Sequence, residues 1–332
     1  MKRRIISVAC KLANVWANRC LVRIFQMCTS FVVLLFMNQI PGIAPVGADP
    51  FQPVTSTNAD KLIIAHSVPG GGNNGRTSFV NALALSPDYI EADLQLTKDG
   101  ILVCLHDPFL EKNSNISDVF PDRFKMVSEN GEQVKRWFVN DFTLAEIKEL
   151  IMAVPLVTLK ELVDLIGNTA GLYLEPKDHP FYQARGVDIE LQLHQFLNAE
   201  VFAGQAAAPI KPVILESFHE RSLHRLRELG GDRYTLIQLI WFSTWHLYMT
   251  EKGLEHVASY ADGIGPMLSM ILPPSSHIIK AAHANKLVVH GWKGYAAFPP
   301  KGYDIEAYSD YLLYGLKLDG LMTKAPDKIK RR

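Results

Sequence analysis

Glu91, Asp93 and His106 fall inside a largely apolar stretch, YIEADLQLTKDGILVCLHD, which covers residues 89–107. Glu91 and Asp93 are two residues apart, so in a strand they point to the same face. Asp99-Gly100 is the dipeptide preferred in a two-residue type I′ hairpin turn. A hairpin closed by that turn places His106 directly opposite Asp93. The alternative is a surface salt bridge, but the apolar flanks favour a buried catalytic cluster.

Two further apolar runs also end in chemically useful side chains. LIIAH ends at His66, and GLYLEPK carries Glu175 with Lys177 two residues later. A buried glutamate is costly unless it is paired or bound to a metal. With Glu91 and Asp93, Glu175 makes an all-oxygen set of three carboxylates, which suits Mg²⁺ or Ca²⁺ better than zinc.

Two histidines, His66 and His106, are expected to flank this cation. Such a pair fits general acid–base chemistry, in which one imidazole withdraws a proton and the other delivers one. The cation and Lys177 would supply positive charge to a phosphodiester. Trp292 fits an apolar wall for the alcohol part of a substrate or a core position. The glycine-rich loop at 70–74 fits either a phosphate-binding backbone or a plain loop.

These residues require a scaffold that brings strand ends together, and the pattern after residue 48 predicts one. Short strand-like runs alternate with longer runs of helical period, as in a parallel barrel or a doubly wound sheet. The predicted strands are 62–66, 89–96, 101–106, 171–175, 212–217, 234–239, 263–265, 287–291 and 319–323. The predicted helices are 78–85, 143–152, 159–166, 188–197, 220–229, 244–256, 276–285 and 304–316.

Nine strands are one too many for a closed eight-stranded barrel, and the hairpin accounts for the extra one. We therefore predict an α/β fold, a (β/α)8 TIM barrel with 101–106 folded back as a β-hairpin arm. A doubly wound sheet is the alternative, although no nucleotide-binding glycine motif follows any predicted strand. Residues 107–155 are too long for a simple loop and are predicted to form a small insertion near the barrel mouth.

The first 48 residues differ from the rest. They hold six basic residues, no acidic residue and an apolar run from about Met27 to Met37, which is short for a membrane span. We interpret residues 1–48 as a signal peptide and 49–332 as one secreted or periplasmic domain. The alternative is an uncleaved anchor, which would be the only membrane contact.

Removal of that leader changes both the charge and the cysteine content. The remainder has 28 basic against 34 acidic residues, a formal net charge of −6, which argues against a nucleic-acid partner. Cys104 is then the single cysteine, so no intramolecular disulfide is possible.

The motifs occur in the order typical of one enzyme family. IIAH with a glycine-rich loop, IEADLQLTKDGILVCLHD, LYLEPK, ILESF, VVHGW and DGLMTKAP together resemble the glycerophosphodiester phosphodiesterase family over about Leu62–Pro326. The resemblance implies a metal-dependent barrel enzyme that hydrolyses small glycerophosphodiesters to glycerol 3-phosphate and an alcohol. It implies acid and base roles for His66 and His106.

The same resemblance assigns the remaining site residues. It implies metal ligation by three carboxylates and a phosphate contact by one lysine. These positions are Glu91, Asp93 and Glu175 for the metal and Lys177 for the phosphate.

Some positions depart from the family pattern. Ser67 and Val68 replace the usual arginine and glycine after the first histidine, and Lys324 stands where aspartate is common. Gly75-Arg76-Thr77 is the nearest match to the usual Glu-Asn-Thr. We hypothesise that Arg76 substitutes for the missing arginine in binding phosphate.

Two other functions stay open at this level. One is a related barrel phospholipase of the sphingomyelinase D or lysophospholipase D type. The other is a non-catalytic binding protein on the same barrel.

Overall fold

The computed structural model describes residues 61–203, 211–273, 275–292, 299 and 304–331. The chain divides into two compact units, Met1–Pro50 and Phe51–Arg332, and the fold below is that of the second unit. The predicted signal peptide lies outside the described residues.

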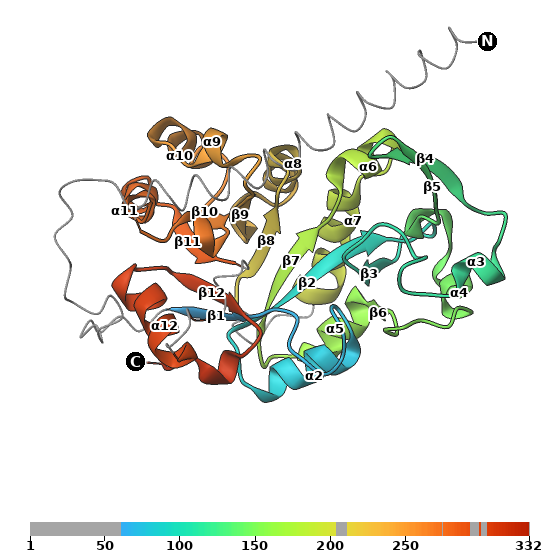
Figure 1. The fold of residues 1–332 in the computed structure, drawn as a ribbon, viewed down its shortest axis with the longest axis horizontal. Coiled ribbons are helices and arrows are strands. Elements are labelled where there is room, and N and C mark those ends of the chain that lie inside the picture. Colours follow the sequence, from blue (N-terminus) through green and yellow to red (C-terminus); the bar gives the residue numbers. More distant parts are fainter. Residues whose placement is uncertain (1–60, 204–210, 274, 293–298, 300–303, 332) are drawn as a thin grey trace, which may run out of the picture. The chain divides into compact units, whose positions relative to one another are not determined.

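Eight parallel strands form a closed barrel, as the sequence predicts (Figure 1). They follow the order β1-β12-β11-β10-β9-β8-β7-β2, and pairing of β2 with β1 closes the ring. Closure excludes the doubly wound alternative, because an open sheet leaves two edges unpaired. The strands are β1 (Leu62–Ala65), β2 (Tyr89–Leu96), β7 (Gly171–Pro176), β8 (Val213–Ser217), β9 (Tyr234–Ile240), β10 (Gly263–Pro266), β11 (Val288–Gly291) and β12 (Gly320–Thr323).

The outer layer consists of helices, several of them begun by side chains that cap the first turn. Thr158 and Glu161 form a capping box at the start of α5, and Asp188 caps α7. The main helices are α2 (Arg76–Ala84), α5 (Leu159–Ile166), α6 (His179–Ala184), α7 (Ile189–Phe196), α8 (Glu220–Gly230), α9 (Trp245–Tyr248), α10 (Glu251–Val257), α11 (His277–Ala284) and α12 (Ile305–Asp310). Along the described segments, no helix is both long enough and apolar enough to cross a membrane.

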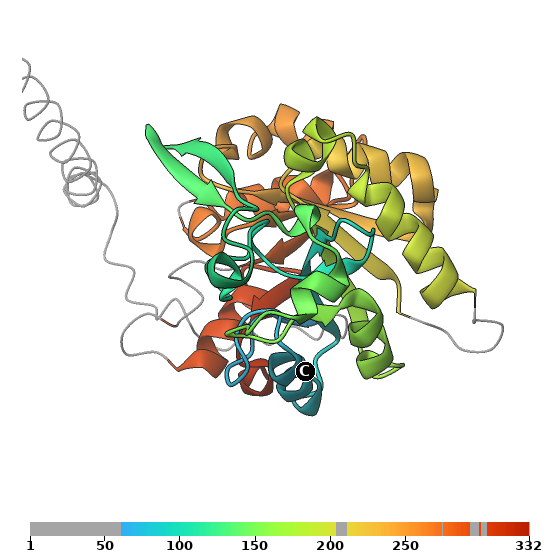
Figure 2. The ribbon, with the colours of Figure 1, turned by 90° about the vertical axis from the view of Figure 1, so that its right-hand side faces the viewer.

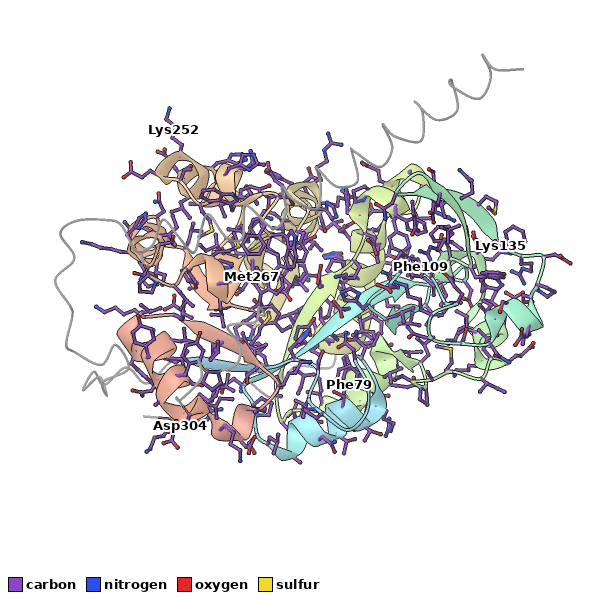
Figure 3. All side chains as sticks on the ribbon, in the orientation of Figure 1. Phe79, Phe109, Lys135, Lys252, Met267 and Asp304 are labelled. Carbon is purple, nitrogen blue, oxygen red and sulfur yellow. The ribbon has the colours of Figure 1, made fainter. Side chains whose placement is uncertain are left out.

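Two apolar clusters hold the barrel together. The interior cluster contains Ile64, Tyr173, Ile214 and Met322, which point inward from separate strands. The larger cluster fills the layer between strands and helices and includes Phe79 of α2 and Met267 after β10 (Figure 3). The described barrel interior is therefore a packed core below the mouth.

The hairpin arm is present, but its turn differs from the predicted one. β3 (Leu102–Cys104) pairs antiparallel with β2, and Leu94 lies opposite Cys104. The loop has three residues because the Thr97 amide bonds the Ile101 carbonyl, at 3.0 Å, and Gly100 adopts φ +78°. Asp93 therefore pairs with Leu105, not with His106.

Residues 107–155 contain elements that the periodicity did not reveal. They are α3 (Ile116–Val119), β4 (Lys125–Glu129), β5 (Glu132–Arg136), the 3-10 turn η1 (Val139–Asp141) and α4 (Leu144–Lys148). β4 and β5 form a separate two-stranded hairpin that projects from the barrel (Figure 2). A third apolar cluster, which includes Leu110, Ile116 and Phe142, packs this segment against the arm. β6 (Val157–Thr158) then pairs with β3.

Candidate active site at the barrel mouth

Four acidic side chains lie near the carboxyl ends of three neighbouring strands. Glu91 and Asp93 come from β2, Glu175 from β7 and Glu216 from β8. In the register of β2 and β7, Asp93 lies opposite Glu175, and in that of β7 and β8, Leu174 lies opposite Leu215. The next residues on β7 and β8, Glu175 and Glu216, therefore lie at the same height in the barrel. Catalytic residues of such barrels occupy this end of the strands.

Glu91, Glu175 and Glu216 form the tightest acidic group. Each can offer a carboxylate oxygen such that all the offered oxygens lie within 4.8 Å of one another. The three residues are 4%, 6% and 2% exposed, respectively. Burial raises the pKa of each carboxyl above its ordinary value, since water no longer stabilises the charged form.

This group fits a divalent cation. Three buried carboxyls cannot all ionise without a counter-charge, and an all-oxygen donor set suits a hard cation. One oxygen, Glu216 Oε2, is buried and has no hydrogen-bond partner among the described atoms. Mg²⁺ or Ca²⁺ at this position would satisfy that oxygen and neutralise the group.

Asp93 lies beside this group with its own partners. Its Oδ2 accepts a hydrogen bond from Asn74 Nδ2 at 2.8 Å, and its Oδ1 lies 3.4 Å from Lys177 Nζ. Burial alone would raise the pKa of Asp93, but Lys177, the two histidines and the hydrogen bond from Asn74 together lower that pKa. The structure therefore keeps Asp93 charged through Lys177, and its role as a cation ligand stays a prediction.

Lys177 links two of the predicted cation ligands. Its Nζ lies 3.1 Å from Glu175 Oε2 as well as near Asp93, and its side chain is largely buried. Although burial lowers the pKa of Lys177, the two carboxylates raise it above its usual value. The amino group is therefore a fixed positive charge at the mouth.

Each predicted catalytic histidine is oriented by a carboxylate. His66 Nδ1 bonds Glu91 Oε2, and His106 Nδ1 lies 2.9 Å from Asp107 Oδ1. His106 lies two residues after the end of β3, and its side chain is 57% exposed, against 19% for His66. A carboxylate at Nδ1 keeps the proton on that nitrogen and makes Nε2 the basic atom.

The glycine-rich loop is held in place by asparagine side chains. Asn74 adopts φ +58° and contacts Asp93 twice, through its amide group to the carboxylate and through its Oδ1 to the backbone amide at 3.1 Å. Arg76 is exposed at the first residue of α2, just after this loop. Its proposed contact with phosphate stays a prediction.

Trp292 joins a row of aromatic rings beyond the acidic group. Its ring lies 5.5 Å from that of Phe218 and stacks on Trp241 at 5.4 Å, measured between centroids. Lys177 Nζ lies 5.9 Å from the centre of the Phe218 ring. Trp292 also packs against the core, which agrees with the core interpretation, and its role as an apolar wall for the substrate stays a prediction.

Comparison with known proteins agrees with this geometry. The model of the Glycerophosphoryl diester phosphodiesterase family matches residues 65–328. The chain belongs to this family. A glycerophosphodiester phosphodiesterase of Bacillus subtilis is 30% identical over 209 residues, which cover 62% of this chain and 68% of the relative. One from Haemophilus influenzae is 28% identical over 273 residues, covering 66% and 72%.

A solved structure supports the same fold. It is that of an Oleispira antarctica phosphodiesterase in complex with the product sn-glycerol-3-phosphate. The match has a TM-score of 0.59 at 17% identity, and it covers 81% of this chain and 94% of the other. At that identity the likeness shows the barrel alone.

One acidic residue of this phosphodiesterase-family chain escaped the sequence prediction. Glu216 ends the apolar run VILE just as Glu175 ends GLYLE. The rule that identified Glu175, a glutamate closing a buried strand, applies equally to Glu216. Asp107, the partner of His106, was visible in the HD pair but was assigned no role.

Proposed function

We propose that this protein hydrolyses glycerophosphodiesters to glycerol 3-phosphate and a free alcohol, and that the reaction requires Mg²⁺ or Ca²⁺. One observation carries the proposal. Two histidines, each held at Nδ1 by a carboxylate, occur at the barrel mouth with a buried acidic group and Lys177. Family membership supports the substrate class.

The cation would be held by Glu91, Asp93 and Glu175. When bound, it supplies positive charge that stabilises the phosphate oxygens as they gain negative charge. Lys177, already cationic at this place, adds charge on the same side of the substrate.

The histidines move the protons. One imidazole accepts, through Nε2, a proton from the attacking water molecule as the oxygen of that water forms the new bond to phosphorus. The other imidazole, in its protonated form, gives a proton to the alcohol oxygen as that oxygen leaves phosphorus. Glu91 and Asp107 hold the rings of His66 and His106 in orientation during both transfers.

A direct assay tests this proposal. The protein is incubated with glycerophosphocholine or glycerophosphoethanolamine, with and without chelator, and glycerol 3-phosphate is measured. We expect release of glycerol 3-phosphate, its loss with chelator and its recovery after divalent cation is added back. No release with any cation would contradict the proposed function, and release unaffected by chelator would contradict the metal dependence.

A second candidate function is the phospholipase D type, acting on lipid substrates that keep a hydrocarbon chain. The observation that favours it is the exposed apolar surface that continues the aromatic row. Trp241, Phe242, Trp245 and Leu247 are between 45% and 54% exposed and fall within seven consecutive positions after β9. Exposed aromatic and aliphatic groups beside a site favour apolar ligands.

The variant Trp241→Ala separates the two functions. If a chain packs on this surface, the KM for lysophosphatidylcholine should rise by about tenfold, because burial of a large apolar side chain contributes about 1.5–3 kcal/mol. The KM for glycerophosphocholine should change far less. Choline release is measured for both substrates, with Ile151→Ala as the matched exposed control on the insertion. Cleavage of glycerophosphocholine alone would remove the second candidate.

A further inference from the structure

Glu216 is a buried acidic residue that the proposed mechanism does not use. It lies in β8, is 2% exposed and points into the barrel from the strand next to that of Glu175. Its Oε2 has no hydrogen-bond partner in the described part of the chain. An unpaired buried carboxylate oxygen costs free energy, so we expect this oxygen to have a binding partner in the functional protein.

The surroundings of Glu216 indicate what that partner is. Glu91 and Glu175 each present an oxygen within 4.8 Å of one from Glu216, so the three oxygens converge. Lys177 directs its amino group to Glu175 and Asp93 instead. The convergent atoms are all acceptors, and a cation is the partner that satisfies three acceptors at once.

The type of cation follows from the number of carboxylates and from burial. Ca²⁺ takes six to eight oxygen ligands, including several carboxylates, in flexible geometry. Mg²⁺ usually keeps several waters and binds through one or two carboxylates. A buried group of three glutamates, with Asp93 beside it, offers more carboxylates than Mg²⁺ usually takes.

We propose that Glu216 is a direct ligand of the active-site cation, in addition to the predicted ligands, and that it makes the site select Ca²⁺ over Mg²⁺. The proposal rests on the divalent-cation requirement of the proposed function and goes beyond it in naming the ligand and the ion.

The test measures cation binding without substrate. The protein is freed of metal with chelator, dialysed and titrated with CaCl₂ or MgCl₂ in a calorimeter. We expect Ca²⁺ to bind at least about tenfold more tightly than Mg²⁺. Glu216→Gln should weaken Ca²⁺ binding by at least about tenfold, since loss of a group that only supports a metal ligand already costs about 10- to 100-fold in affinity. Equal affinities for the two ions, no binding of either, or unchanged Ca²⁺ affinity in Glu216→Gln would overturn the proposal.

Thermal melting separates a ligand from a structural residue. In metal-free protein, Glu216→Gln should melt at a higher temperature than the unmodified chain, because a neutral amide replaces one of three crowded, buried carboxyls that cannot all ionise without a counter-charge. The rise in melting temperature caused by Ca²⁺ should shrink in the variant, since stabilisation follows affinity. A purely structural role predicts the reverse: a lower melting temperature and an unchanged Ca²⁺ effect.

Two further variants keep the test decisive. Glu190→Gln is the matched control, because Glu190 is equally buried but is bonded to His179 Nδ1 at 2.9 Å. It should bind Ca²⁺ as the unmodified chain does, and an equal loss in both variants would overturn the proposal. Glu216→Asp keeps the charge but shortens its reach, so it should bind with intermediate affinity if Glu216→Gln does not fold. Calcium affinity as high as that of the unmodified chain would then count against ligation.

The result is distinguishable from failure of the proposed function. Ca²⁺ binding that depends on Glu216, without release of glycerol 3-phosphate from any diester, would refute only the reaction. Hydrolysis with a cation site indifferent to Glu216 would refute only the present inference.

Discussion

Replacing His66 by alanine should lower kcat for glycerophosphocholine by about 10²- to 10⁴-fold, the range typical of a lost general acid or base. The ring is oriented by its bond to Glu91 at the mouth of the barrel. His106→Ala should cost a similar factor, because His106 is the second proposed proton-transfer group and its ring is held by Asp107. Glycerol 3-phosphate release is the measurement.

The pH dependence distinguishes proton transfer from a positioning defect. The unmodified protein should show a bell-shaped profile of kcat/KM, with one limb for the acid and one for the base. Each histidine variant should lose one limb. His224→Ala is the control, since His224 is an exposed histidine that also lies near a carboxylate, 3.5 Å from Glu220. Retention of half or more of kcat in both His66→Ala and His106→Ala would refute the assignment.

Lys177→Met should impair both the stability and the activity of the protein. Lys177 is the cation shared by Glu175 and Asp93, and its removal leaves two buried carboxylates without that partner. Breaking a buried pair in this way costs about 3–5 kcal/mol of unfolding free energy. Loss of a fixed positive charge near the reacting phosphate should lower kcat by about 10²- to 10³-fold.

The stability loss should depend on pH in a defined direction. In the unmodified chain Lys177 helps to lower the pKa of Asp93 in the folded state. The stability that this interaction contributes is therefore present above the pKa of Asp93 in the unfolded chain and is lost as pH falls through the folded pKa. In Lys177→Met, burial raises the pKa of both carboxyls, so the folded state binds more protons and regains stability as pH falls. The stability deficit should therefore be smaller at acidic pH.

Urea denaturation of metal-free protein at several pH values checks this expectation. Lys160→Met is the control, because Lys160 is an exposed lysine paired with Asp164 at 2.6 Å and should change stability little. A deficit in Lys177→Met that grows toward acidic pH would contradict the assigned coupling.

The barrel could be predicted from the sequence because its signals are local and repeated. Most of the parallel strands are short apolar runs, the longer helices show helical periodicity, and several helices start at a capping side chain. Prediction was less accurate where the pattern depends on tertiary packing. Residues 244–256 were predicted as one helix, but α9 and α10 are separate. β4 and β5, with mostly exposed charged side chains, carry little apolar alternation to detect.

The hairpin shows how a single turn limits the prediction of a site. The sequence predicts a two-residue loop at Asp99-Gly100. In the structure, the backbone and side chain of Thr97 bond to Ile101, so the loop between them has three residues, 98–100. The Thr97 hydroxyl also bonds to Asp99 within the loop. One residue of register moves a side chain to the opposite face. His106 is nevertheless at the mouth, because it follows the end of β3 and is no longer bound by the strand's alternation.

The separate apolar cluster of the insertion has a consequence for how the protein can vary. Its members pack mainly among themselves and with the arm, whereas the acidic group belongs to strands stabilised by the barrel's own core. Substitutions among the members of this cluster should therefore destabilise the insertion locally and cost the barrel core little stability. The link that must be preserved in any redesign of this segment is Asp107, because its carboxylate holds the ring of His106.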